Sequence, residues 1–281
     1  MAQLSSRLRQ AGISLVELMI ALALGLMLVA GLYTMLSSNQ QTYSAVRTNT
    51  QLSDSERRIE LVMDKMLNQA GFRNYARVRD KEKLPAATVS GANGTTLNWV
   101  VGQAITGVNN SSGVSGVKDG TDTLTIRFYG SSRTDMDPSL SAAADLTTAD
   151  DTIFDCSGTS RSRNNLVTMT FFVDESNNLK CYDNLSQTAT IMETGVENMQ
   201  FRFRTSGETA QFIVAPAANS SDWNNIQIIE YAMLVAKAYQ QGMTNQVRTF
   251  QLLDTTVTSS ADGKMRQIIR GSNMLRNQDK S

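Results

Sequence analysis

A run of apolar, small and hydroxylic residues from 13 to 36 contains a single charged side chain, Glu17. A helix rises about 1.5 Å per residue, so the apolar part of this run can cross a hydrocarbon core of roughly 30 Å. We therefore expect one membrane-spanning helix. A carboxylate in hydrocarbon costs roughly 2.5 kcal/mol or more, which makes Glu17 a candidate functional residue.

The short segment before the run sets the expected orientation. It contains Arg7 and Arg9 and no acidic residue. Cytoplasmic flanks of membrane helices carry an excess of Lys and Arg, so we expect the N-terminus in the cytoplasm and everything after residue 36 outside it. The rest of the chain is then an ectodomain.

Composition excludes several classes of function. The chain has 281 residues, a formal net charge of zero and no run of Lys or Arg, so we expect one sizeable domain and no nucleic-acid partner. It contains no His, which removes Ser-His-Asp and Cys-His catalysis and makes most zinc and non-haem iron sites improbable. We therefore predict no enzyme activity, no catalytic residue, no metal site and no cofactor.

The helix is expected to continue beyond the membrane. Residues 40–70 contain no Pro or Gly, and apolar side chains recur at spacings of three and four, which predicts an amphipathic helix. A capping-box pattern at Ser53 and Glu56 is compatible with a break and restart, and Gly71 is a suitable C-terminal stop. The apolar positions are Tyr43, Val46, Ile59, Val62, Met63, Met66, Leu67 and Ala70.

The sequence beyond Pro85 is rich in Thr, Val, Asn, Ser and Gly and contains strand patterns. "TDTLTIRFYG" alternates apolar and polar residues, and "NLVTMTFFVDESNNLKCYDN" reads as two strands joined by a turn at Asn177 and Asn178. Residues 102–120 and 139–151 are expected to be surface loops. We predict an α+β fold in which a long N-terminal helix packs on an antiparallel sheet. Further predicted strands are "NMQFRFR", "NIQIIEYAMLVAKAY" and "VRTFQLLDTTV".

The junction "QAG|ISLVE" resembles the prepilin signal of type IV pilins and type II secretion pseudopilins. In those families a membrane peptidase, the prepilin peptidase, cuts after the glycine and methylates the new N-terminus. The resemblance implies cleavage between Gly12 and Ile13 and N-methylation of Ile13, which stands where most relatives have Phe. The alternatives are an ordinary cleaved secretory signal, which places its cut after the apolar region, and a plain signal anchor.

The same resemblance gives Glu17 a role. Cleavage would leave a positive amine on Ile13, and an opposite charge is its natural partner in a low-dielectric site. In the family, this acid is thought to meet the N-terminal amine of a neighbouring subunit as subunits enter a helical filament. Glu17 is therefore the expected assembly contact. The alternative is a carboxylate that reaches the membrane surface without a specific partner.

Several ectodomain segments resemble the PilW family of type IV pilus minor pilins. They are "DTLTIRF", "LKCYDN", "GVENMQFRF", "WNNIQIIEYAMLVAKAY", "RTFQLLDTTV" and "MLRN". Residues 258–272 depart from the compact ending of that family, so no last strand is assigned there. The resemblance implies a leader at 1–12, a transmembrane and assembly helix at 13–36, an amphipathic spine helix at 37–71 and a β-rich periplasmic head at 72–281.

A PilW-like minor pilin would help prime pilus assembly and lie near the fibre tip. Its expected partners are other minor pilins, the major pilin, the prepilin peptidase and the inner membrane. Before assembly it would cross the inner membrane once with a periplasmic C-terminal domain, and after assembly it would belong to the extracellular pilus.

Two cysteines, Cys156 and Cys181, lie in the expected ectodomain. An even count outside the cytoplasm favours a disulfide. It would close a loop of about 25 residues, worth roughly 3 kcal/mol in the chain-entropy model. Two buried free thiols are the alternative.

Other functions remain open at this stage. A J-type minor pseudopilin of type II secretion shares the signal and the sheet. A membrane-anchored enzyme would use the paired acids of "DGTD", "TDMDPS" or "ADD", although such acids are more often solvated turns. A calcium-binding adhesin would use Asp135 and Asp137, or Asp119 and Asp122, but no complete calcium-ligand spacing is present.

Overall fold

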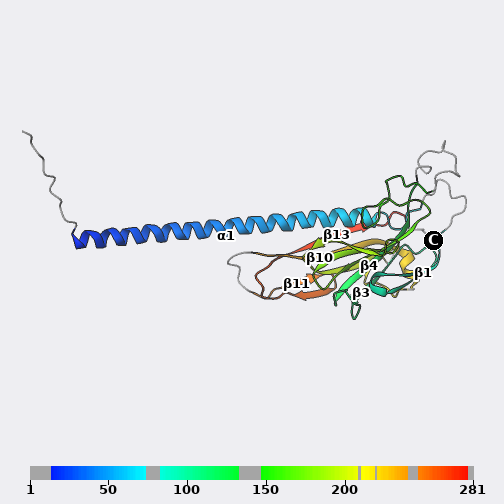
Figure 1. Cartoon of the computed structure of the whole chain (residues 1–281). Helices are drawn as coiled ribbons and strands as arrows, with labels where there is room; N and C mark the ends of the chain where they lie inside the picture. Colours follow the sequence, from blue (N-terminus) through cyan, green and yellow to red (C-terminus); the bar gives the residue numbers. More distant parts are fainter. Residues whose placement is uncertain are drawn as a thin grey trace, which may run out of the picture.

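The protein is described by a computed structural model that covers residues 14–73, 83–132, 147–207, 210–218, 220–239 and 246–277. A single long helix runs along one side of a β-rich head and projects well beyond it (Figure 1). The strands lie beside the C-terminal half of the helix only. The α+β arrangement predicted from the sequence is confirmed.

The helical elements are α1 (Leu15–Leu67), η1 (Ala92–Gly94) and η2 (Ser221–Asn225), the last two being short 3₁₀ turns. The strands are β1 (Ala87–Ser90), β2 (Thr96–Trp99), β3 (Ile105–Ser111), β4 (Thr121–Tyr129), β5 (Leu166–Val173), β6 (Asn178–Asp183), β7 (Thr188–Thr194), β8 (Val196–Thr205), β9 (Phe212–Ile213), β10 (Ile226–Lys237), β11 (Thr249–Leu252), β12 (Thr255–Thr258) and β13 (Met265–Met274).

Helix α1 is continuous over 53 residues, a length of roughly 80 Å. The break allowed by the capping-box pattern at Ser53 does not occur, because Leu52 and Ile59 on either side are both buried and packing holds this stretch helical. The helix ends at Leu67 and Gly71 follows in the left-handed region at φ +74°. A Cβ at Gly71 would stand 2.7 Å from the carbonyl oxygen of Asn277, so only glycine fits this turn.

One stripe of α1 is buried against the head. Its members recur every three or four positions, the spacing of one helical face. This stripe differs from the one predicted from the sequence in two ways. Tyr43 and Val46, which were predicted members, are exposed, and two hydroxyl residues are buried with the apolar ones. The buried members are Thr48, Leu52, Ser55, Ile59, Met63, Met66 and Leu67.

The head contains two larger antiparallel sheets rather than the single sheet expected. One has the order β13-β10-β8-β9 and the other β3-β4-β5-β6-β7. Helix α1 packs on β13, β10 and β7, while β8 packs against β3 to β6. The main core therefore lies between the helix and the facing sheets. In β4, Leu124, Ile126 and Phe128 point into this core, as their alternation predicts.

Two predictions of local structure were wrong, and one strand was not assigned. Residues 102–120, expected to be a loop, contain β3, which pairs with β4 along Ile105 to Ser111. "VRTFQLLDTTV" is a hairpin of β11 and β12 that turns at Leu253, where φ is +48°. Residues 258–272, left without a strand, contain most of β13, which pairs with β10 over ten positions. Pairing between strands decides each of these, and the pattern of apolar residues within one segment does not encode it.

A hairpin of β1 and β2 covers the outer face of the five-stranded sheet, and Arg127 of β4 fastens it there. Its guanidinium donates hydrogen bonds to the carbonyl oxygens of Gln103 (2.5 Å), Pro85 (2.6 Å) and Val100 (2.9 Å). It also lies 4.5 Å from the ring centroid of Trp99. Arg127 is fully buried, and this burial lowers its pKa to about 10.

Candidate assembly surface

The N-terminal half of α1 presents an apolar surface that the head does not cover. Every large apolar side chain from Leu15 to Leu36 is more than half exposed. This half of the helix is long and apolar enough to cross a membrane. An apolar surface of this extent needs lipid or other protein around it. The exposed side chains are Leu15, Val16, Leu18, Met19, Ile20, Leu22, Leu24, Leu26, Met27, Leu28, Val29, Leu32, Tyr33, Met35 and Leu36.

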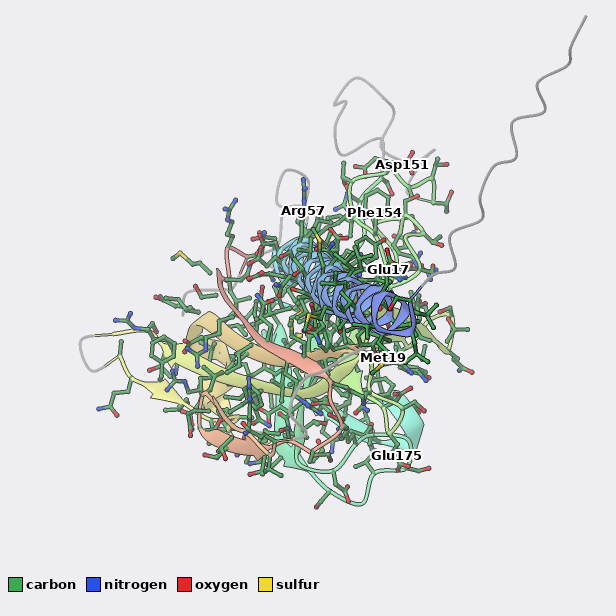
Figure 2. The ribbon with its side chains drawn as sticks, turned by 90° about the vertical axis from the view of Figure 1, so that its left-hand side faces the viewer. Glu17, Met19, Arg57, Asp151, Phe154 and Glu175 are labelled. Carbon is green, nitrogen blue, oxygen red and sulfur yellow. A yellow bond between two sulfur atoms is a disulfide. The ribbon has the colours of Figure 1, made fainter. Side chains whose placement is uncertain are left out.

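Glu17 lies in the first turn of this apolar half and is exposed. No other charged residue occurs between Ser14 and Val46. Figure 2 looks along α1 from its N-terminal end and shows Glu17 there, well separated from Glu175 on the far side of the head. Among the described residues no basic side chain pairs with Glu17. A carboxylate in the first turn of a helix also interacts favourably with the positive end of the helix macrodipole.

Gly12 and Ile13, the predicted cleavage and methylation positions, lie outside the described residues. So do Asp135 and Asp137, two of the acids considered as calcium ligands. Their assignments stay predictions.

A buried carboxylate fixes the C-terminal half of α1 to the head. Glu193 of β7 accepts hydrogen bonds from Ser55 (3.0 Å) and Arg58 (2.6 Å) of the helix and from Lys237 of β10 (2.8 Å). The Glu193 side chain is only 4% exposed. Burial alone would raise the pKa of Glu193, but these three donors outweigh it and lower the pKa to about 2. Glu193 therefore stays ionised and joins the helix to both sheets.

Polar contacts from β13 and the residues after it hold the next part of the helix. Gln267 donates to Glu56 at 2.9 Å, and Asn273 donates to Asp64 at 2.8 Å. Asn277 donates to the carbonyl oxygen of Asn68 at 2.9 Å. These three residues follow one another along the helix, so the last strand determines how the spine sits on the head.

The disulfide lies near the C-terminal end of α1. Cys156 and Cys181 are joined, which links β6 to the loop before β5. The side chain of Gln69 accepts from the backbone N–H of Phe154 at 2.8 Å and donates to its carbonyl oxygen at 3.1 Å. Lys65 lies 4.0 Å from the centroid of the Phe154 ring. The loop that carries Cys156 therefore caps the end of the spine helix.

The other acids considered as calcium ligands are committed to the protein's own backbone. Asp122 is buried and accepts from the N–H groups of Asn110 (2.8 Å) and Phe201 (2.7 Å), which connects the two sheets. Burial raises the pKa of Asp122 to about 6 even though these bonds act in the opposite direction. Asp119 accepts from the N–H of Gly113 at 2.9 Å. Within the described ranges no group of three acidic or cysteine side chains could hold a metal ion.

Sequence reasoning missed Glu193, Lys237 and the polar residues of β13. Glu193 stands in "MET", an ordinary strand sequence, and its partners come from residues 138 and 44 positions away. The usable signal was the pair Ser55 and Arg58, polar residues at helical spacing, of which Ser55 falls on the buried face of the helix.

Two family models match parts of the chain. Residues 160–277 match the family model described as Type IV Pilus-assembly protein W, and residues 7–33 match the prokaryotic N-terminal methylation motif. No curated protein matches the chain significantly. Among solved structures, a type IV-like pilin from Thermus thermophilus is similar, with 13% identity, coverage of 81% of this chain and 98% of that chain, and a TM-score of 0.41.

An N-terminal methylation motif that leads into a long helix, with an exposed apolar half and a head of antiparallel sheets, defines a type IV pilin-like protein. Over residues 160–277 the chain carries a domain similar to the PilW family of type IV pilus-assembly proteins. It is a membrane-anchored, non-enzymatic protein that interacts with other components of the pilus. The matched region includes β13.

Proposed function

We propose that this protein is a minor subunit of the type IV pilus that helps prime assembly and lies near the fibre tip. The observation that carries the proposal is the exposed apolar half of α1 with Glu17 as its one charge. The family match over the head favours a pilus subunit over a type II secretion pseudopilin. The segments proposed are a leader (1–12), a membrane and assembly helix (13–36), a spine helix (37–71) and a periplasmic head (72–281).

In the proposed sequence of events, the prepilin peptidase cuts between Gly12 and Ile13 and methylates Ile13. The new amine is positive and enters a low-dielectric environment as the helix leaves the bilayer for the fibre. Glu17 of this subunit neutralises the amine of a neighbouring minor or major pilin. The head passes from the periplasm to the surface of the extracellular pilus.

Processing is tested by mass spectrometry of the mature protein. We expect it to begin at Ile13 with an N-methyl group, and we expect Gly12→Val to remain full length because a branched side chain crowds a site built around glycine. A mature N-terminus at Ser37 or beyond would identify an ordinary signal peptide and end the proposal.

Assembly is tested by comparing subunit in membranes with subunit in sheared pili. Glu17→Ala should insert and be cleaved normally, but its amount in pili should fall by about two orders of magnitude, since leaving one charge of a buried pair unpaired costs about 3–5 kcal/mol. Glu17→Asp should be intermediate. Glu175→Ala, an acid on the side of the head away from α1, is the matched control (Figure 2). Normal incorporation of Glu17→Ala would exclude the assigned role.

Position in the fibre needs a separate experiment. Antibody-gold labelling of sheared pili should mark fibre ends, and cross-linking before shearing should recover other minor pilins. Labelling spread evenly along the fibre would contradict the tip location.

A further inference from the structure

The head contains a cavity of about 450 Å³ between the outer face of the five-stranded sheet and the β1–β2 hairpin. Small-molecule sites in proteins commonly have volumes of about 300–1,000 Å³. Strand β3 forms one side of the cavity, the hairpin and η1 form another, and the loop between β3 and β4 closes a third. Strands β1 and β3 lie on the side of the head away from α1, so packing of the spine helix leaves this cavity free (Figure 1).

The floor of the cavity is an array of threonines. Thr106 of β3 is opposite Thr125 of β4, and Thr125 is opposite Thr170 of β5, so the three form one row across the sheet. Directly opposed residues of antiparallel strands share a face. Thr123 adds a fourth hydroxyl two residues along β4. The hydroxyls of Thr125 and Thr170 lie 3.0 Å apart and hydrogen-bond to each other.

Two polar atoms of the lining lack a partner. Thr106 is 3% exposed, and within the part of the chain that the structure describes its hydroxyl makes no hydrogen bond. The same holds for the Oδ1 atom of Asn109, also in the lining. A buried polar atom without a partner costs about 1–3 kcal/mol, and native proteins leave few of them. A bound molecule with hydroxyl groups would supply both partners.

The remaining walls define the rest of the ligand's chemistry. They are largely apolar, and among the described residues no Lys, Arg, Asp or Glu lines the cavity. A charged ligand would lose its hydration here without a counter-charge, which is strongly unfavourable. A neutral ligand with hydroxyls on one side and C–H groups on the other matches the lining. The apolar walls come from Ala92, Leu97, Val114, Val117, Phe172 and Ala218.

We propose that this cavity is a binding site for a neutral saccharide of one or two rings. The sugar hydroxyls bond to Thr106, Asn109 and the Thr125–Thr170 pair, and its C–H face lies against the apolar walls. The site gives the head a ligand-binding activity that is separate from assembly through α1. It does not depend on Glu17 or on processing.

The test is saturation-transfer NMR on the full chain in dodecylphosphocholine micelles, because detergents with sugar headgroups would occupy the site. Glucose, galactose, N-acetylglucosamine and lactose are titrated, with glucuronate and glucosamine as charged counterparts. At least one neutral sugar should bind saturably with a Kd of about 1 mM or tighter. The charged counterparts should bind at least tenfold more weakly.

Three variants locate the binding. Thr106→Val keeps the shape, removes only the unpartnered hydroxyl, and should weaken binding roughly tenfold without loss of folding. Thr96→Trp, at an exposed position of the wall, should block the cavity without changing the core. Thr168→Val is the matched control, since Thr168 is buried two residues before Thr170 on the same strand and lies outside the lining.

Near-ultraviolet circular dichroism shows whether each variant is folded. Binding weakened roughly tenfold in Thr106→Val and lost in Thr96→Trp, with binding kept in Thr168→Val, supports the proposal. No saturable binding of any neutral sugar to the wild type overturns it. Binding to Thr106→Val and Thr96→Trp as tight as to the wild type overturns it as well. A preference for glucuronate or glucosamine over the neutral sugars also overturns it.

Discussion

Replacing Glu193 by glutamine keeps the shape of the side chain and removes the charge that joins α1 to the two sheets. The hydrogen bonds from Arg58, Lys237 and Ser55 lower the pKa of Glu193 from 4.5 to about 2. A difference of this size corresponds to roughly 3 kcal/mol of stability at neutral pH. Arg58 is 55% exposed, so water screens the part of this stabilisation that comes from its ion pair with Glu193. We therefore expect Glu193→Gln to lower the free energy of unfolding by about 2–3 kcal/mol.

The sign of the pH dependence follows from the lowered pKa. The stabilisation is complete above pH 4.5, where the unfolded chain is also ionised, and is lost as the pH falls from 4.5 to about 2. The gap in stability between wild type and Glu193→Gln should close over this window.

The assay is urea unfolding of the full chain in a non-ionic detergent, followed by fluorescence of the buried Trp99 and Trp223. Amide hydrogen exchange of residues 48–67 shows whether the helix itself loosens. Glu230→Gln is the control, because its pair with Arg202 (2.8 Å) is partly exposed and should contribute less than about 1 kcal/mol. Equal losses in the two variants, or a gap that persists at pH 2, would refute the role given to Glu193.

The remaining predictions concern the head. Arg127→Met should destabilise the protein by about 3 kcal/mol or more, because three carbonyl oxygens lose a donor that is itself fully buried, and exchange should rise first in β1 and β2. Arg204→Met, at an exposed position, is its control, and similar unfolding midpoints would contradict the prediction. Cys156→Ser with Cys181→Ser should lower stability by about 3 kcal/mol in non-reducing urea titrations, since the bridge spans 25 residues. Reductant should lower the free energy of unfolding of the wild type only. If reductant also destabilises the double variant, the disulfide is not the source of the difference.

Part of the candidate site was readable from the sequence because its signal is local. Glu17 interrupts an apolar run, and both the run and its exception are properties of consecutive residues. The buried stripe of α1 was predicted from Ile59 onward for the same reason, since helical periodicity is set by near neighbours. Glu193 was not found, because its importance comes from donors on α1 and β10 that only the folded chain brings together.

The sequence by itself determined the membrane-spanning potential of α1, the place of Glu17, the pairing possible for two cysteines and most strands of the head. These depend on hydrophobicity and on periods of 2 and 3.6 residues, which act over short distances. Only the tertiary structure decided that β3 and β13 are strands, that two sheets face each other, and that Thr106, Thr125 and Thr170 form one row. Strand order and register depend on the burial of side chains distant in sequence, and this energy exists only once the core is assembled.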